Sequence, residues 1–133
     1  MATQTIDETW LARKADWVDR VTRLIDEVER WATAEGWAVH RFDKNLKESV
    51  TGEYIVPMLR MRGPHGELFL TPIALRLAGG GDGRVDLEAW PSMNRVRFIG
   101  KGDTWEIITD SNVPLRQSWN RDTFVQLARD LQG

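Results

Sequence analysis

The sequence predicts an α+β fold in which a long N-terminal helix packs on a curved antiparallel meander of about six strands, followed by a short C-terminal helix. Two observations predict it. Apolar residues recur at helical spacing over the first third of the 133-residue chain and at alternate positions after Trp37. The connections between the alternating segments are short and contain Gly, Pro, Asn and Asp, which favours hairpins between successive strands. We expect residues 1–133 to form a single domain.

The first helix is predicted over Asp7–Glu35. Four large apolar residues in it recur every seven positions: Trp10, Trp17, Leu24 and Trp31. Charged residues occupy the opposite side, which is the pattern of a helix with one buried face. Two start signals compete, because either Thr5 or Asp7 can serve as the N-cap. Gly36 is the expected stop.

Six strands are predicted where apolar and polar residues alternate: Trp37–Phe42, Glu53–Arg62, Glu67–Leu77, Arg84–Trp90, Arg95–Ile99 and Thr104–Asp110. The segment Asp43–Gly52 is interpreted as a flexible connection between the first two strands, with a binding lid as the alternative. The last helix is expected over Arg121–Leu131, with Asn120 as its N-cap. Trp119, directly before the cap, is expected to pack on Phe124.

The short turns also suggest how the strands pair. Folding the second and third strands symmetrically about their turn pairs Arg62 with Glu67 and Pro57 with Pro72. Because neither proline can donate to the ladder, we expect a bulge or bend there. The remaining predicted pairs are Glu53 with Arg76, Leu75 with Leu87, Arg76 with Asp86, Glu88 with Arg97, Leu87 with Phe98, Arg97 with Glu106, Val96 with Ile107, and Phe98 with Trp105.

This pairing sorts the side chains onto two faces of the sheet. The predicted core face, beneath the first helix, consists of Tyr54, Val56, Met58, Ile73, Leu75, Leu77, Val85, Leu87, Ala89, Val96, Phe98, Trp105 and Ile107. The opposite face carries two rows of alternating charge, Glu53–Arg76–Asp86 and Glu88–Arg97–Glu106. Toward its other end lies an apolar group of Leu59, Met61, Leu68, Leu70, Trp90 and Ile108.

The charged rows supply the candidate catalytic residues: Glu53, Arg76, Asp86, Glu88, Arg97 and Glu106. Carboxylates on one face can hold a divalent metal or act as acid and base, while an arginine stabilises an anion. A small metal-assisted, nuclease-like hydrolase is therefore one hypothesis. Pairing of opposite charges across the strands explains the same residues without any ligand. We assign no metal site and no cofactor.

The leading hypothesis is a non-enzymatic binding or interaction module whose ligand the sequence does not identify; we expect a protein partner or self-association. It rests on the lack of a nucleophile motif, a metal-ligand cluster or a cofactor motif in the sequence. The candidate binding residues are Trp90, Arg95 and Ile108. We expect the C-terminal helix to cover Trp90; the alternative is an open patch in which Arg95 lies opposite Trp90.

Composition narrows the classes of partner and location. The chain has 18 basic and 20 acidic residues, a net charge of −2, which makes a nucleic-acid partner unlikely. No run approaches the roughly 18–20 apolar residues of a membrane helix, so no membrane partner is expected. The first ten residues do not resemble a secretory signal, and the chain lacks cysteine. We therefore expect a cytoplasmic protein.

Element lengths suggest self-association as a homodimer. A helix of about 29 residues is roughly 43 Å long, whereas strands of seven to ten residues span about 23–33 Å. The part of the helix beyond the sheet would contain Trp10 and Leu11. A dimer could use these residues or the apolar group around Leu59 and Leu70. The alternative is a monomer in which Trp10 packs on the sheet edge or on Trp37.

Overall fold

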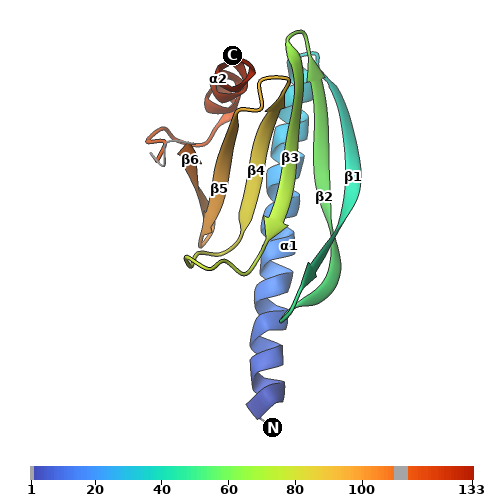
Figure 1. Cartoon of the computed structure of the whole chain (residues 1–133), viewed down its shortest axis with the longest axis vertical. Coiled ribbons are helices and arrows are strands. Elements are labelled where there is room, and N and C mark those ends of the chain that lie inside the picture. Colours follow the sequence, from blue (N-terminus) through green and yellow to red (C-terminus); the bar gives the residue numbers. More distant parts are fainter. Residues whose placement is uncertain (1, 110–113) are drawn as a thin grey trace.

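The computed structural model describes residues 2–109 and 114–133, with side chains described from Thr9 onward within these ranges. The elements are α1 (Ala2–Ala34), β1 (Ala38–Glu48), β2 (Gly52–Gly63), β3 (Gly66–Ala74), β4 (Arg84–Trp90), β5 (Arg95–Lys101), β6 (Thr104–Thr109) and α2 (Arg121–Gln132). The strands form one antiparallel sheet of order β1-β2-β3-β4-β5-β6 (Figure 1). The predicted α+β fold, a long helix, a six-stranded meander and a short helix, is confirmed.

The helix ends follow two of the three predicted signals. Helix α1 begins at Ala2, so Thr5 and Asp7 lie inside the helix and neither is its N-cap. After α1, Gly36 takes a φ of 83° and its N–H donates to the Thr33 carbonyl, which is the expected glycine stop. Helix α2 has its predicted N-cap, since the Asn120 side chain accepts a hydrogen bond from the backbone N–H of Thr123.

Strand β1 is longer than predicted. It continues to Glu48, and its ladder with β2 is unbroken from Ala38↔Arg62 to Glu48↔Gly52. The predicted flexible connection Asp43–Gly52 is therefore mostly strand. Its polar residues belong to an edge strand, and edge strands carry more charged and polar side chains than strands in the middle of a sheet. The predicted end of the last strand, Asp110, lies outside the described residues.

Strand pairing was predicted correctly in one place and shifted in the others. The tip of the β2–β3 hairpin pairs Arg62 with Glu67, as predicted, but the ladder stops at Leu59↔Leu70. Strands β3 and β4 pair Leu70 with Leu87, a shift of five residues from the predicted Leu75 with Leu87. The β4–β5 and β5–β6 hairpins are each shifted by two residues, which keeps every side chain on its predicted face. The following predicted pairs do not form: Glu53 with Arg76, Arg76 with Asp86, Glu88 with Arg97, Leu87 with Phe98, Arg97 with Glu106, Val96 with Ile107, Phe98 with Trp105 and Pro57 with Pro72.

The two prolines mark places where the buried side of a strand changes. In β2 the buried residue before Pro57 is even-numbered, Val56, whereas those after it are odd-numbered, Leu59 and Met61. The β3–β4 register shifts between Pro72 and Ala74. These are the bends expected from two prolines that cannot donate to the ladder. As a consequence, the residues predicted to form an outer apolar group lie fully buried in the core: Leu59, Met61, Leu68 and Leu70. They cannot mediate a dimer. Ile73, predicted in the core, is exposed for the same reason.

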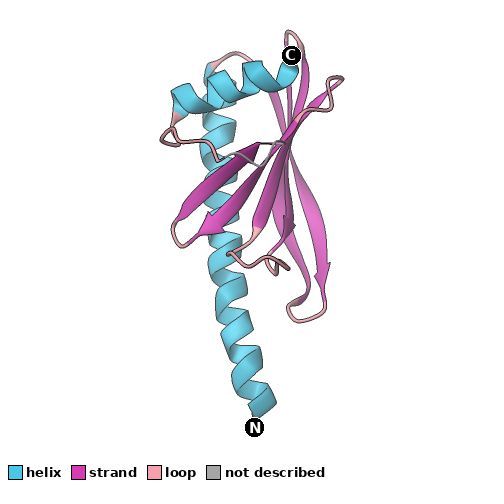
Figure 2. Cartoon of the chain, turned by 60° about the vertical axis from the view of Figure 1, so that its left-hand side comes forward, coloured by secondary structure: helices cyan, strands magenta, loops and turns pink. Residues whose placement is uncertain are grey.

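Both helices cover the same face of the sheet (Figure 2). Helix α1 runs along it, and α2 lies across the end of α1 and contributes Phe124, Leu127, Ala128 and Leu131 to the same core. Trp119 packs against Phe124 with ring centroids 6.2 Å apart, as predicted. Neither helix is apolar enough over a sufficient length to cross a membrane, as far as the described residues go.

No described helix covers the opposite face of the sheet, which we call the open face. Its side chains alternate along the strands with the buried ones: Arg60, Arg62, Glu67, Phe69, Thr71, Arg84, Asp86, Glu88, Trp90, Arg95, Arg97, Ile99, Lys101, Glu106 and Ile108.

Candidate functional site

The first cluster of the open face is a carboxylate shared by two arginines. Arg60 and Arg62 are two residues apart on β2, so both project from the open face toward β3, where Glu67 pairs with Arg62. Oε1 of Glu67 accepts hydrogen bonds from Nη2 of Arg60 at 2.5 Å and from Nη2 of Arg62 at 2.9 Å. These bonds, that from Arg60 above all, hold the pKa of Glu67 below its ordinary value.

A second cluster of the same kind lies on β4 and β5. Asp86 is buried, and its two carboxylate oxygens accept from Nε and Nη2 of Arg84 at 2.7 and 2.9 Å. The bond to Asp86 raises the pKa of Arg84. Arg95 lies 3.9 Å from the same carboxylate. In both clusters the carboxylate is less exposed than the arginines, so each cluster presents two guanidinium groups and a formal charge of +1 to the outside.

Further cations line a hollow at one end of the open face. Arg84, Arg97 and Lys101 surround an open pocket of about 400 Å³ together with Glu106. Ile99 and Ile108 provide its apolar surface, and the loop of residues 77–80 closes one side. Because Arg84 is already bonded to Asp86, Arg97 and Lys101 with Glu106 leave an excess of one positive charge in this hollow, which favours an acidic side chain there.

Trp90 stands at the other end of the open face. The prediction that α2 covers it is wrong: Trp90 is 56% exposed, because α2 packs on the helix-covered face. Helix α2 instead holds the β4–β5 turn from the side, since Ser92 Oγ and Asn94 Nδ2 both donate to the carbonyl of Leu131. Arg95 is paired with Glu88 and not with Trp90, whose partner in the ladder is Glu67. The exposed indole therefore lies next to the first arginine cluster.

Two of the candidate catalytic residues lie away from the others. Glu53 is in the β1–β2 hairpin, where it forms a salt bridge with Lys47 at 3.2 Å. Arg76 follows β3; its backbone N–H donates to Glu48, and its guanidinium lies 6.0 Å from the ring of Trp10. The predicted row that joins Glu53 and Arg76 to Asp86 is therefore not formed.

The remaining candidates share the open face but are matched with different neighbours. In the ladders Glu88 pairs with Arg95, Arg97 with Asp86, and Glu106 with Ile99. Ile108 pairs with Arg97 and also forms an isolated bridge with Pro114. Across residues 2–109 and 114–133, no group of three or more His, Cys, Asp or Glu side chains is arranged to hold a metal ion.

A half-buried hydrogen-bond network lies where β3 leaves β2. Glu48 accepts from the backbone N–H groups of Leu75 at 3.2 Å and Arg76 at 2.9 Å, and the Tyr54 hydroxyl donates to the same carboxylate. Nε1 of Trp17 donates to the Tyr54 oxygen at 3.1 Å. Burial and the adjacent carboxylate raise the pKa of Tyr54. Every group in this network has a structural partner, so we assign it a structural role.

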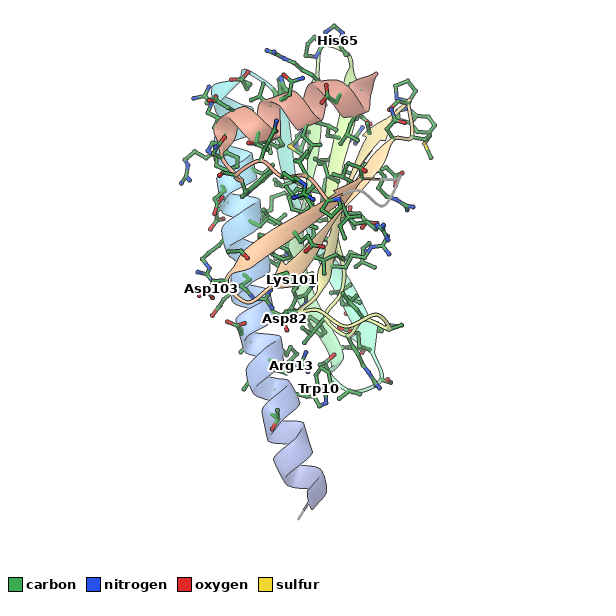
Figure 3. The ribbon with its side chains drawn as sticks, turned by 90° about the vertical axis from the view of Figure 1, so that its left-hand side faces the viewer. Trp10, Arg13, His65, Asp82, Lys101 and Asp103 are labelled. Carbon is green, nitrogen blue, oxygen red and sulfur yellow. The ribbon has the colours of Figure 1, made fainter. Side chains whose placement is uncertain are left out.

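Sequence reasoning missed a pocket on the helix-covered side of the molecule. It is lined by residues of α2, the end of α1 and the β2–β3 turn, which carries His65 at the top of the molecule (Figure 3). The sequence offered one signal, a tryptophan directly after the glycine stop of α1, but the position of α2 could not be predicted from the pattern of apolar residues.

Comparison with known proteins identifies no relative: no protein-family model, no curated protein and no solved structure matches this chain. The chemistry of the site is therefore inferred from its side chains. The open face presents guanidinium donors, an exposed indole and a cationic hollow, which together suit the binding of acidic and apolar groups.

Proposed function

We propose that the protein is a non-enzymatic interaction module whose open face binds an acidic segment of a partner protein. One observation carries this proposal: two carboxylates, Glu67 and Asp86, lie low on an uncovered sheet face, and each is shared by two more exposed arginines. The carboxylates hold the guanidinium groups in place while leaving excess positive charge toward the outside.

The arrangement favours a protein partner with carboxylates. Guanidinium groups bind carboxylates through paired, charge-assisted hydrogen bonds, and positioned arginines lose less freedom on binding. Tryptophan and arginine are the side chains that most often dominate binding energy at protein interfaces, and Trp90 and Arg95 flank the same turn. Glu88 and Glu106 lie on the same face and would repel a continuous phosphate backbone. An acidic peptide segment, whose carboxylates are spaced by other residues, avoids this repulsion.

Selection from a displayed library of random peptides tests the proposal. We expect the wild-type protein to enrich peptides with several Asp or Glu residues around an apolar residue. Arg95→Glu should weaken binding of an enriched peptide at least tenfold, since it replaces attraction by repulsion, and Trp90→Ser should weaken it as well. Arg30→Glu, an exposed charge reversal on α1, is the matched control and should change binding little. Enrichment without acidic residues, or equal loss in the control, would contradict the proposal.

A second proposal concerns self-association, and it rests on the shape of α1. The helix extends well beyond the strands at its N-terminal end (Figures 1 and 2), as its 33 residues and length of roughly 50 Å require. In this region Leu11 is 53% exposed. Trp10, in contrast, is half-buried against the core, and its ring lies 4.2 Å from the guanidinium of Arg13 and 6.0 Å from that of Arg76. We propose that two chains associate through this part of α1 as a homodimer.

Light scattering over a range of micromolar concentrations tests the dimer. A mass near twice 15.3 kDa that falls to the monomer value in Leu11→Glu, with unchanged circular dichroism, supports it. A monomer mass at all concentrations excludes it. Ala15→Glu, another exposed position further along α1, distinguishes a local contact from a general effect of added charge.

A further inference from the structure

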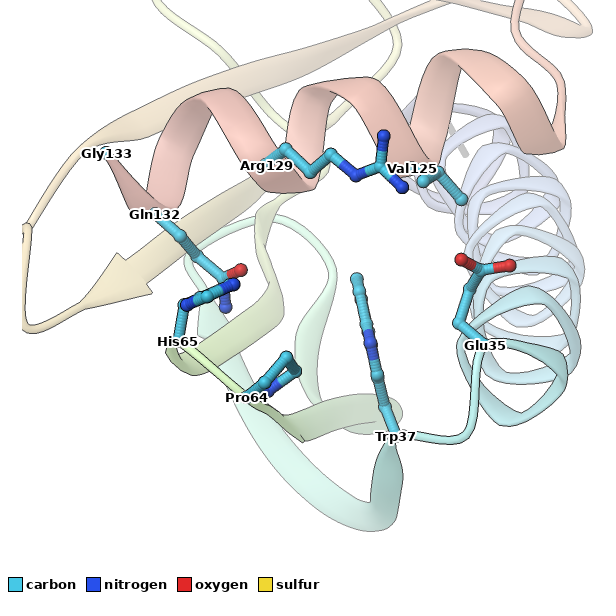
Figure 4. Close-up of a pocket in the computed structure, with 8 residues that line it drawn as sticks. All are labelled: Glu35, Trp37, Pro64, His65, Val125, Arg129, Gln132 and Gly133. Carbon is cyan, nitrogen blue, oxygen red and sulfur yellow. The ribbon is translucent and has the colours of Figure 1, made fainter.

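A pocket of about 750 Å³ lies between α2, the C-terminal end of α1 and the β2–β3 turn (Figure 4). This volume is within the range of small-molecule sites. Trp37, Pro64 and Val125 supply its apolar surface, and His65, Arg129 and Gln132 supply polar groups. None of these residues belongs to the open face, so the pocket is a separate site.

The indole of Trp37 is a fixed wall of this pocket. A Cβ atom built at Gly63 would lie 3.4 Å from the Trp37 ring, so the ring rests against the backbone of β2. Its centroid is also 5.8 Å from that of Phe124, which is fully buried. A ring held from two sides presents a preformed flat surface, and ligand binding then requires little ordering of this side chain.

Hydrogen-bond donors around the pocket lack acceptors. Arg129 forms no ion pair and His65 no hydrogen bond with any residue that the structure describes. Nε2 of Gln132 is buried and has no partner within the described chain. Glu35 at the rim is already engaged, since it accepts from Nη2 of Arg121 at 2.7 Å. Arg129 and His65 are exposed and can bind water, but a buried donor without an acceptor is unfavourable, so Nε2 of Gln132 indicates that the occupant carries an acceptor.

We propose that this pocket binds a small aromatic carboxylate, with its ring against Trp37 and a carboxylate oxygen at the Gln132 amide, while the exposed guanidinium of Arg129, which lies toward Val125 in Figure 4, supplies the positive charge. An amide N–H can donate to a carboxylate oxygen, and a guanidinium at the same pocket stabilises the negative charge. A single negative charge fits better than a phosphate dianion, because the pocket has one unpaired arginine and the C-terminal end of α2, with its partial negative charge, lies at the rim. Both a free aromatic acid and the C-terminus of a peptide ending in an aromatic residue carry this chemistry.

An NMR titration of the ¹⁵N-labelled protein with 2-naphthoate tests the proposal. We expect saturable shifts of the Trp37 indole N–H and the Gln132 side-chain amide at millimolar or lower concentration. The neutral 2-naphthamide should bind at least tenfold more weakly, and Arg129→Gln should weaken 2-naphthoate binding by a similar factor. Arg30→Gln, an exposed arginine outside the pocket, is the matched control and should leave binding unchanged.

Two further arms complete the test. N-acetyl-Gly-Gly-Phe is compared with 2-naphthoate: tighter binding of the tripeptide identifies a peptide C-terminus as the source of the carboxylate, and tighter binding of 2-naphthoate identifies a free acid. His65→Ala provides a second variant at the exposed turn, where no hydrogen bond or ion pair to a described residue is lost, and it should weaken binding as well. Shifts that do not saturate for either probe, or binding that is unchanged in both pocket variants, would overturn the proposal.

Discussion

Replacing Gly83 with alanine should destabilise the protein far more than the same change at Gly80 in the same loop. A Cβ atom at Gly83 would lie 2.2 Å from Cζ3 of Trp17, well inside the ordinary carbon–carbon contact of about 3.5–4 Å. Trp17 is fully buried and its Nε1 is bonded to the Tyr54 hydroxyl, so the ring cannot move away freely. At Gly80 a Cβ atom would meet nothing within 4 Å.

The two glycines share a positive φ, of 104° at Gly83 and 82° at Gly80, so the backbone cost of an alanine is common to both. That cost is about 1–2 kcal/mol. Overpacking against Trp17 adds about 1–3 kcal/mol at Gly83 alone. Urea unfolding of both variants at pH 7 measures the difference between their free energies of unfolding. Equal destabilisation would show that Trp17 does not pack on Gly83, and would refute this account of the glycine-rich loop.

Further predictions concern the core and two titrating groups. Leu87→Ala should lower the free energy of unfolding by about 2–5 kcal/mol in urea titrations, because it leaves a cavity at a fully buried position. Burial, and then a neighbouring carboxylate, raise the pKa of Tyr54 in the folded state. The unfolded state therefore loses this proton first, stability falls as pH rises above about 10, and Tyr54→Phe should remove that part of the alkaline slope. Hydrogen bonds from Arg60 and Arg62 lower the pKa of Glu67, so its contribution is present above its unfolded pKa of 4.5 and is lost as pH falls through the lower folded value. Glu67→Gln should flatten the acid limb of a stability–pH profile measured by urea unfolding.

The elements that could be predicted are those with local signals. The apolar stripe of α1, its glycine stop and the Asn120 cap of α2 each depend on residues within a few positions of one another. The tip of the β2–β3 hairpin was predictable for the same reason, since a short turn fixes the first pairs. The two prolines correctly indicated bends because their missing N–H groups act wherever the strand lies.

The errors arise where contacts between residues distant in the sequence determine the strand register and the buried face. Leu75 fits the alternation of a strand, yet it lies beyond the end of β3 and is buried from the following loop, where Glu48 binds its backbone N–H. The β3–β4 connection is therefore longer than predicted, and the predicted β3–β4 register differs from the observed one by five residues. The parity change at Pro57 moved Leu59 from the predicted outer face into the core. No local sequence pattern predicts which face of the sheet α2 covers. Trp90 is exposed because α2 packs on the other face.

The candidate site was predicted in part. Sequence reasoning placed Asp86 on the face away from α1 and paired it with an arginine, but assigned Arg76 as the partner. In the structure Asp86 instead forms salt bridges with Arg84 on the same strand and with Arg95 on the next strand. Neighbours two apart on one strand can bond each other when their side chains lean together, which a prediction from cross-strand pairing alone overlooks.

The most direct test of the central claim is a chemical-shift map of the ¹⁵N-labelled protein titrated with an acidic peptide selected from the library. Binding at the open face predicts the largest changes at the Nε signals of Arg84 and Arg95 and at the indole N–H of Trp90, with affinity falling as salt is raised. Signals from the exposed side of α1, such as Arg30, should stay unchanged. Shifts concentrated on α1 or α2, with the arginines of β4 and β5 unaffected, would contradict the claim that the uncovered face of the sheet is the binding surface.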